Sequence, residues 1–170
     1  MKLLLHTCCA PCLIYPLEIL SGKGYEVVSY YYNPNIHPAE EFEKRRLEVE
    51  RYSGLKSLRA IFPEYKSEDF FAVIGDNRHR PERCLLCWEM RLRATAKYAK
   101  KEGFQAFSTT LLVSPYQDQE AIKKIGDKIE KESQLKFHYE DFRVGYRKAH
   151  SEAKANGIYC QKFCGCQFSA

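Results

Sequence analysis

The sequence predicts an α/β fold in which helices flank a parallel sheet. Short apolar and β-branched stretches alternate with longer amphipathic ones, as in chains built from β–α units. The chain has 170 residues, of which 45% are hydrophobic, and this suits one domain with its own core. We therefore expect one α/β domain over residues 1–170, ending in a cysteine-bearing tail at about 157–170.

The first half of the chain predicts two strands and three helices. The apolar run Lys2–His6 predicts a buried strand, and the β-branched and aromatic run 25–32 predicts another. Pro38, followed by two glutamates, is typical of a helix start. Helices are expected at 12–20, 38–53 and 68–74. Pro16 fits the first of these only if it lies in the first turn.

The second half continues the same alternation. Ile122, Ile125 and Ile129 form one stripe in the stretch 118–132, which indicates an amphipathic helix. Further strands are expected at 105–111 and 135–139, and further helices at 85–101 and 146–155.

Several polar and cysteine residues directly follow predicted strands. In parallel α/β sheets the ligand site lies beyond the carboxyl ends of the strands. Cys8, Asn33 and the loop 109–118 occupy such positions. We therefore expect them to share one rim of the sheet.

Charge and hydropathy restrict the class of protein. The net charge of +5 is modest, and it permits an RNA partner without requiring one. No stretch approaches 18 apolar residues, so we expect no membrane span. The apolar run Leu3–Leu5 ends at His6 with no A-x-A site after it, so we expect no signal peptide. We therefore expect a cytoplasmic protein in a reducing compartment. There, eight cysteines indicate metal binding or redox chemistry more than structural disulfides.

Seven of the eight cysteines fall into three motifs. Cys84 and Cys87 form a C-x-x-C pair near a helix start, where two thiolates can point at one metal or cluster. Cys8 and Cys9 would face opposite sides of a regular strand, so only an irregular loop can direct both at one centre. The tail carries a C-x-C pair whose disulfide would close a small, strained and easily reduced ring. That pair is an electron relay or a further pair of metal ligands.

Six segments together resemble one known family, and they span nearly the whole chain in order. They are LHTCCAPC at 5–12, YYNPNIHP at 31–38, RCLLCWEMRL at 83–92, TTLLVSPYQD at 109–118, DFR at 141–143 and YCQKFCGC at 159–166. In these segments the chain is similar to the QueH family of epoxyqueuosine reductases. The resemblance implies a Rossmann-like parallel sheet flanked by helices, related to the adenine-nucleotide α-hydrolase group. The Ser-Gly-Gly phosphate loop of the ATP-using relatives is missing, and the cysteine loop takes its place.

The resemblance also implies an activity and a set of site residues. The activity is the cobalamin-independent deoxygenation of epoxyqueuosine, at the wobble position of a tRNA anticodon, to queuosine, with electrons from an unidentified donor. A [4Fe–4S] cluster would be held by Cys8, Cys9, Cys84 and Cys87, while Cys164 and Cys166 would form the redox-active pair. The family is associated with a second, mononuclear iron, and loop position and ligand chemistry suggest Cys12 and Asp118 for it.

The reaction needs two electrons and two protons and releases water. Asp118 is either a proton donor or the N-cap of the helix that follows it. Bases of RNA loops stack on aromatic residues, and basic residues bind the phosphates. Tyr116 is the expected stacking residue, and Arg83 and Arg91 are the expected RNA contacts.

His6 and His37 are interpreted as hydrogen-bonded structural histidines, although both could ligate a metal. Two other functions remain open from the residues alone. One is a zinc-stabilised RNA-binding module without catalysis, and the other is a thiol–disulfide oxidoreductase without metal.

Overall fold

A computed structural model describes residues 1–169 and contains a five-stranded sheet in the order β3–β2–β1–β4–β5. Every pair of neighbouring strands is parallel. The strands are β1 (Lys2–His6), β2 (Glu26–Tyr30), β3 (Ala60–Ile61), β4 (Ala106–Thr109) and β5 (Lys136–Phe137). The prediction of a parallel α/β fold is therefore confirmed.

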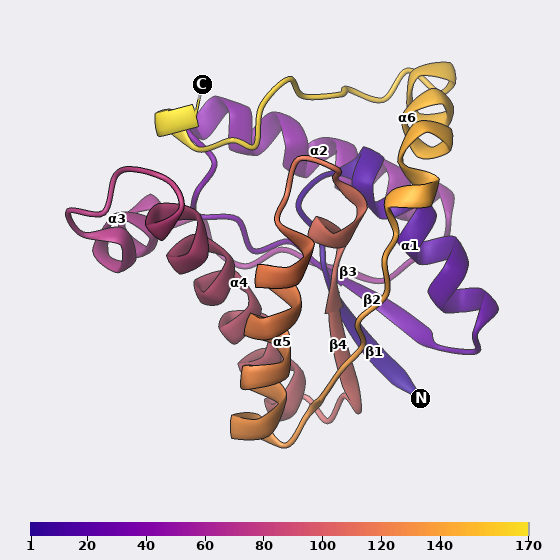
Figure 1. Cartoon of the computed structure of the whole chain (residues 1–170). Coiled ribbons are helices and arrows are strands. Elements are labelled where there is room, and N and C mark those ends of the chain that lie inside the picture. Colours follow the sequence, from indigo (N-terminus) through magenta and orange to yellow (C-terminus); the bar gives the residue numbers. More distant parts are fainter. Residues whose placement is uncertain (170) are drawn as a thin grey trace.

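Helices cover both faces of this sheet (Figure 1). One layer contains α1 (Ala10–Gly22), α2 (Ala39–Leu55) and α6 (Tyr146–Ala155), and the other contains α4 (Glu82–Lys101) and α5 (Gln119–Ser133). The short helix α3 (Ser67–Ile74) packs on α4. Three 3₁₀ turns complete the described elements: η1 (Thr110–Val113), η2 (Arg143–Gly145) and η3 (Gln167–Ser169).

The central strand explains why the two layers form one core. Leu3, Leu4 and Leu5 of β1 are fully buried, as expected for a strand covered on both faces. Leu4 pairs with Val28 of β2 on one side and with Phe107 of β4 on the other. Because β1 lies between these strands, its carboxyl end opens at the middle of the rim.

The structure corrects the expectation for α1. We expected this helix to begin at Cys12, with Pro16 in its first turn. It begins at Ala10, because Pro11 sits in the first turn, where a backbone N–H is not needed. Pro16 therefore lies inside the helix and cannot donate the usual bond to the carbonyl of Cys12.

Beyond α6 the chain crosses the rim at the carboxyl ends of the strands (Figure 1). Arg45 of α2 anchors this tail by donating to the carbonyls of Phe163 and Cys164, each at 3.1 Å. The backbone N–H of His37 donates to the carbonyl of Gly165 at 2.8 Å. The tail is thus an ordered wall of the rim up to residue 169. No helix among residues 1–169 has the length and apolar character needed to cross a membrane.

Candidate functional site

Three cysteines gather at the carboxyl end of β1. The chain leaves the strand in an extended conformation at Cys9 and turns directly into α1, so consecutive side chains are not held on opposite faces. The sulfurs of Cys8, Cys9 and Cys12 lie within 4.8 Å of one another. Over the described range 1–169, they form the one compact group of three or more metal-ligating side chains. We call them the trio.

Hydrogen bonds make the three thiols of the trio unequal. Hydrogen bonding with Cys12 and Cys9 holds the pKa of Cys8 well below its ordinary value. Thr110 of η1 adds a further donor, 3.2 Å from the Cys8 sulfur, and its hydroxyl accepts the Cys8 backbone N–H at 3.0 Å. Burial raises the pKa of Cys9. The hydrogen bond between Cys12 and Cys8 raises the pKa of Cys12. Cys8 is therefore the thiol of the trio that ionises most readily.

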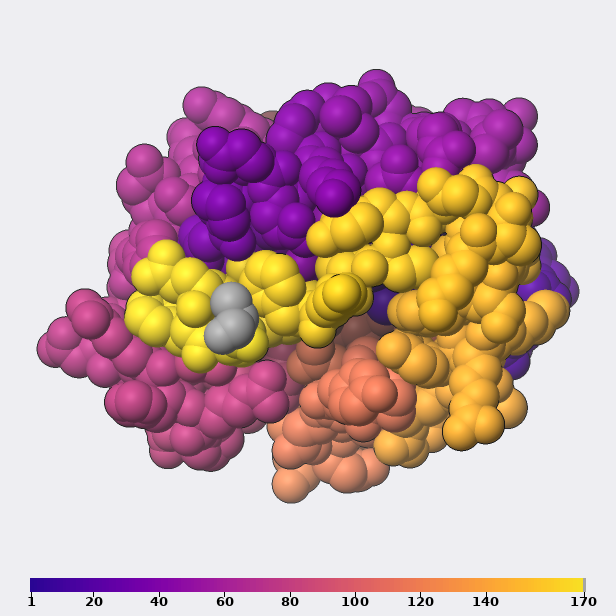
Figure 2. Space-filling model, turned by 90° about the horizontal axis from the view of Figure 1, so that it is seen from above, coloured from indigo at the N-terminus to yellow at the C-terminus, as the bar shows by residue number. Residues whose placement is uncertain are grey.

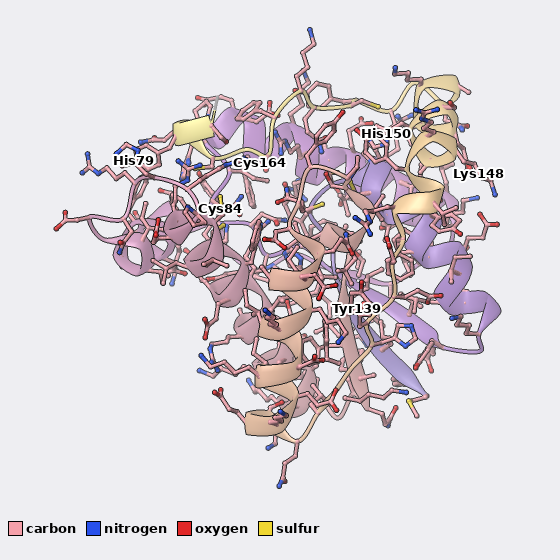
Figure 3. All side chains as sticks on the ribbon, viewed as in Figure 1. His79, Cys84, Tyr139, Lys148, His150 and Cys164 are labelled. Atoms are coloured by element: carbon pink, nitrogen blue, oxygen red, sulfur yellow. The ribbon has the colours of Figure 1, made fainter. Side chains whose placement is uncertain are left out.

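Four further cysteines meet at the start of α4. Cys84 and Cys87 lie in its first two turns, and the tail brings Cys164 and Cys166 against them. Figure 3 shows Cys164 on the tail near Cys84, with His150 on the opposite side of the rim. These four residues, which we call the quartet, line a hollow of about 20 Å³. Burial raises the pKa of Cys87 to about 11, and the charge of Arg91 partly offsets this rise.

A larger cavity of about 380 Å³ is lined by residues of both groups. Cys8 and Cys12 of the trio and Cys164 of the quartet contribute to its lining. In Figure 2 a hollow opens between the yellow tail and the orange loop after β4, with indigo atoms of the amino-terminal segment in its depth. We call it the central cavity. Its volume is in the usual range for ligand sites.

The four expected cluster ligands are divided between these two groups. Cys8 and Cys9 belong to the trio, whereas Cys84 and Cys87 lie outside that compact group. Cys12, expected near a second iron, joins the trio. Cys8 lines the central cavity, whereas Cys84 and Cys87 line the small hollow of the quartet. The assignment of one cluster to all four residues stays a prediction.

Buried polar atoms around the two hollows lack partners. Arg91 is 4% exposed, and it lines both the central cavity and the hollow of the quartet. It has no carboxylate partner among the ion pairs of residues 1–169, and its one hydrogen bond, to Asn33 Oδ1, is 3.3 Å long. Arg91 Nε, Asn35 Oδ1 and Gln161 Oε1 are buried without a partner in the described structure. Unpaired buried groups of this kind are costly, so the site is built for a polar or anionic guest.

The tail depends on one glycine. Gly165 lies between Cys164 and Cys166 with a φ of 111°, a conformation that L side chains rarely adopt. A Cβ at this position would lie 2.7 Å from Ile36 Cγ1 and 3.0 Å from Arg45 Nη1. The close approach explains why the two cysteines of the tail are separated by glycine.

Asp118 was predicted to be either a proton donor or the N-cap of a helix, and the structure shows it as the N-cap. Its carboxylate accepts the Ala121 N–H at 3.0 Å, which makes it the N-cap of α5, and it is exposed. Its neighbour Gln117, and not Asp118, lines the central cavity. The cap is confirmed, and the role as proton donor or iron ligand stays a prediction.

The two histidines and the arginine that the sequence singled out here, His6, His37 and Arg83, are all buried. His6 is buried, with Nδ1 3.0 Å from Thr109 Oγ1 and Nε2 3.0 Å from the Tyr32 carbonyl, so its structural interpretation is confirmed. His37 receives only a 3.4 Å bond from Gln167 N–H, and its Nε2 has no partner in the described structure. Arg83, expected to contact RNA, is buried and donates to the carbonyl of Arg78 at 2.8 Å.

Comparison with known proteins identifies the family. Residues 3–170 match the family model described as epoxyqueuosine reductase QueH. This chain belongs to the QueH family. Because members of this family are epoxyqueuosine reductases, the prediction that the chain is an oxidoreductase is confirmed.

QueH relatives match along almost the full chain. The epoxyqueuosine reductase QueH of Thermotoga maritima is 37% identical over 174 residues, covering 98% of this chain and 88% of the relative. That of Dehalococcoides mccartyi is 35% identical over 169 residues, covering 99% of this chain and 92% of the relative. A crystal structure of a predicted subunit of tRNA methyltransferase from Methanocaldococcus jannaschii has a TM-score of 0.59 at 10% identity. It covers 91% of this chain and 76% of that one, and it supports the fold alone.

Sequence reasoning missed three residues of this QueH site. Thr110 lies in a segment that we quoted, but its bond to Cys8 joins residues that are far apart in the chain. Arg45 belongs to a helix whose many charged residues are typical of a solvent-exposed surface. Its side chain is nevertheless buried and hydrogen-bonded to the tail. Asn35 lies in the turn after β2 and gave no signal beyond its position at the rim.

Proposed function

We propose that this chain deoxygenates epoxyqueuosine in the wobble position of a tRNA anticodon to queuosine, without cobalamin. The single observation that supports this most is that thiols of both groups, Cys8 and Cys12 of the trio and Cys164 of the quartet, line one cavity. Removal of an epoxide oxygen needs a store of electrons on one side of the substrate and a proton source beside it. The central cavity provides room for both.

The residues present fit an iron–sulfur cluster. Such clusters are held by cysteine thiolates, and here seven thiols lie in two groups, three of them in the lining of the central cavity. A cluster bound by four thiolates is anionic overall, which suits the buried Arg91 charge with no carboxylate partner in the described chain. We propose Cys8, Cys9, Cys84 and Cys87 as its ligands, with Cys12 directed to a second iron. When bound, the cluster passes electrons one at a time, and an open-sited iron polarises the epoxide oxygen.

The tail pair balances the reaction. Oxidation of Cys164 and Cys166 to a disulfide releases two electrons and two protons, the number that converts an epoxide to an alkene and water. Cys164 lines the central cavity and lies 2.9 Å from Ser169 Oγ, so a proton acceptor or donor is at hand. Because Asp118 caps α5 outside the cavity lining, we assign proton delivery to Cys164.

The test combines metal analysis with turnover. Protein purified anaerobically is assayed for iron, sulfide and zinc, and for deoxygenation of tRNA that carries epoxyqueuosine. We expect Cys84→Ser to lose the iron and the brown colour, and Cys164→Ser to keep both but lose turnover. Cys160→Ser is the matched control, because Cys160 lies in neither group and its sulfur faces the Ile158 carbonyl at 3.5 Å.

Two outcomes would reject the proposal. Colourless protein with stoichiometric zinc and no turnover would indicate an RNA-binding module. Turnover that survives removal of all metal would indicate a thiol–disulfide oxidoreductase.

A further inference from the structure

The loop between α3 and α4 carries two exposed arginines that form no ion pair within the described residues 1–169. Arg78, His79 and Arg80 are exposed, and Figure 3 shows His79 projecting from the rim. No ion pair within residues 1–169 involves any of them, whereas Arg46, on α2, pairs with two glutamates. Both arginines are therefore available to pair with an anionic partner.

This loop lines a cavity that lies next to the central cavity. Arg78, His79, Arg80, Arg83, Phe168 and Ser169 line a hollow of about 480 Å³. Arg80 and Ser169 also line the central cavity, so the two share a wall. Neither lining contains an aspartate or glutamate within the described chain. Arg80 lines the hollow of the quartet as well as both cavities, so a cationic lining extends from the sulfur groups past Arg80 to Arg78.

Internal contacts hold the loop in this position. Arg83 donates to the carbonyl of Arg78 at 2.8 Å, and the guanidinium groups of Arg78 and Arg83 lie 5.9 and 5.8 Å from the Phe168 ring. The buried Arg83 thus supports the exposed arginines instead of contacting a partner itself. This reassigns the role that we expected for Arg83 from the sequence.

The opposite rim of the central cavity is aromatic. Tyr116 is 77% exposed, and its ring meets that of Tyr146 edge to face at 6.1 Å. The ring of Tyr146 lies 4.1 Å from that of His150. All three line the central cavity. Exposed aromatic rings on one side and free arginines on the other are the combination that single-stranded RNA requires.

We infer that Arg78 and Arg80 bind phosphates of the RNA strand beside the reacting nucleoside, while Tyr116 stacks on a neighbouring base. This rests on the proposed function, since it names the surface that holds the proposed tRNA substrate. The nucleoside enters the central cavity between the trio and Cys164, and its strand follows the path past Arg80 to the hollow of Arg78. Asp76 and Glu82 flank the loop, but neither lines either hollow.

Binding of an anticodon stem-loop RNA, measured by fluorescence anisotropy over a range of salt concentrations, tests this surface. The double variant Arg78→Gln/Arg80→Gln should bind at least about tenfold more weakly at low salt. Its slope of log K against log salt should fall by about 1.4, because each phosphate contact contributes about 0.7 in a single strand. Tyr116→Ala should weaken RNA binding without changing this slope. Tyr116→Phe should bind RNA as tightly as the unmodified protein, because the aromatic ring is kept.

The matched control is Lys56→Gln/Arg59→Gln. It removes the same charge from a groove with no cysteine in its lining, and neither residue has an ion pair within residues 1–169. We expect its salt slope to equal that of the unmodified protein. An unchanged slope in the Arg78/Arg80 variant, or an equal loss in the control, would overturn the inference while leaving the proposed function intact. No RNA binding by the unmodified protein would overturn both.

Discussion

Replacing Gly165 by alanine should release the tail from the rim. The backbone at φ 111° costs an L residue about 1–3 kcal/mol, and the Cβ contacts with Ile36 and Arg45 add about 1–3 kcal/mol of overpacking. The tail is held here by two bonds from the Arg45 guanidinium, worth about 1.5–3 kcal/mol each, and one from His37 N–H, worth about 1 kcal/mol. Because the cost is comparable to the anchoring, we expect residues 163–166 to detach while the sheet stays folded.

Thiol alkylation with mass spectrometry detects this change. Cys166 is 5% exposed, so it should react slowly in the unmodified protein and rapidly in Gly165→Ala. Gly157→Ala is the matched control, because Gly157 also has a positive φ, of 65°, but open space around its Cβ. Both variants carry backbone strain, and only one has the steric contacts. If Cys166 stayed as protected in Gly165→Ala as in Gly157→Ala, the steric argument would be refuted.

Three other predictions concern the trio, the tail and the buried charge. Thr110→Val should destabilise the protein by about 1–3 kcal/mol in urea unfolding, because the Cys8 N–H loses its acceptor, and Thr110→Ser should not. Burial lowers the pKa of His37 below 6.5, so the unfolded chain binds its proton first as the pH falls. Stability should therefore be full above pH 6.5 and decline below it, and His37→Gln should flatten this profile. Arg91→Met should stabilise the metal-free protein by about 1–4 kcal/mol in calorimetry, because it removes a buried charge that has no carboxylate partner in the described chain, and it should abolish turnover. A destabilised variant would contradict the interpretation of Arg91 as an unpaired charge.

Most of the scaffold could be predicted because its signals are local. The run Lys2–His6 matches β1, and the stretch 146–155 matches α6, because period and flanking residues are contained in each segment. The two-residue strand β3 was missed, since it is too short for any alternation to show. We placed the start of α4 at Leu85, but it begins at Glu82, so Cys84 lies inside the first turn and not before it.

The site was only partly predictable because its decisive contacts are not local. That an irregular loop would bring Cys8 and Cys9 together followed from strand geometry alone. The tail over the central cavity did not follow, because the bond from Arg45 to Cys164 joins residues 119 apart in the sequence. A charged helix such as α2 also gives no sign that one arginine turns inward. Charge pattern alone favoured Arg83 for RNA, and only burial distinguishes it from the exposed Arg80.

The two sulfur groups differ in how firmly the fold holds them. The trio lies between β1 and α1, in the main core, where opening requires disruption of the central sheet. Half of the quartet is carried by the tail, whose anchors are a few hydrogen bonds and the small apolar cluster around Phe70 and Ile74. Segments with few buried contacts open at lower free energy than the core. A dithiol on such a segment can meet an external reductant after each turnover without exposing the trio. This difference in local stability is why we assign the renewable electrons to Cys164 and Cys166 of the tail, and the fixed metal ligands to the trio and to α4.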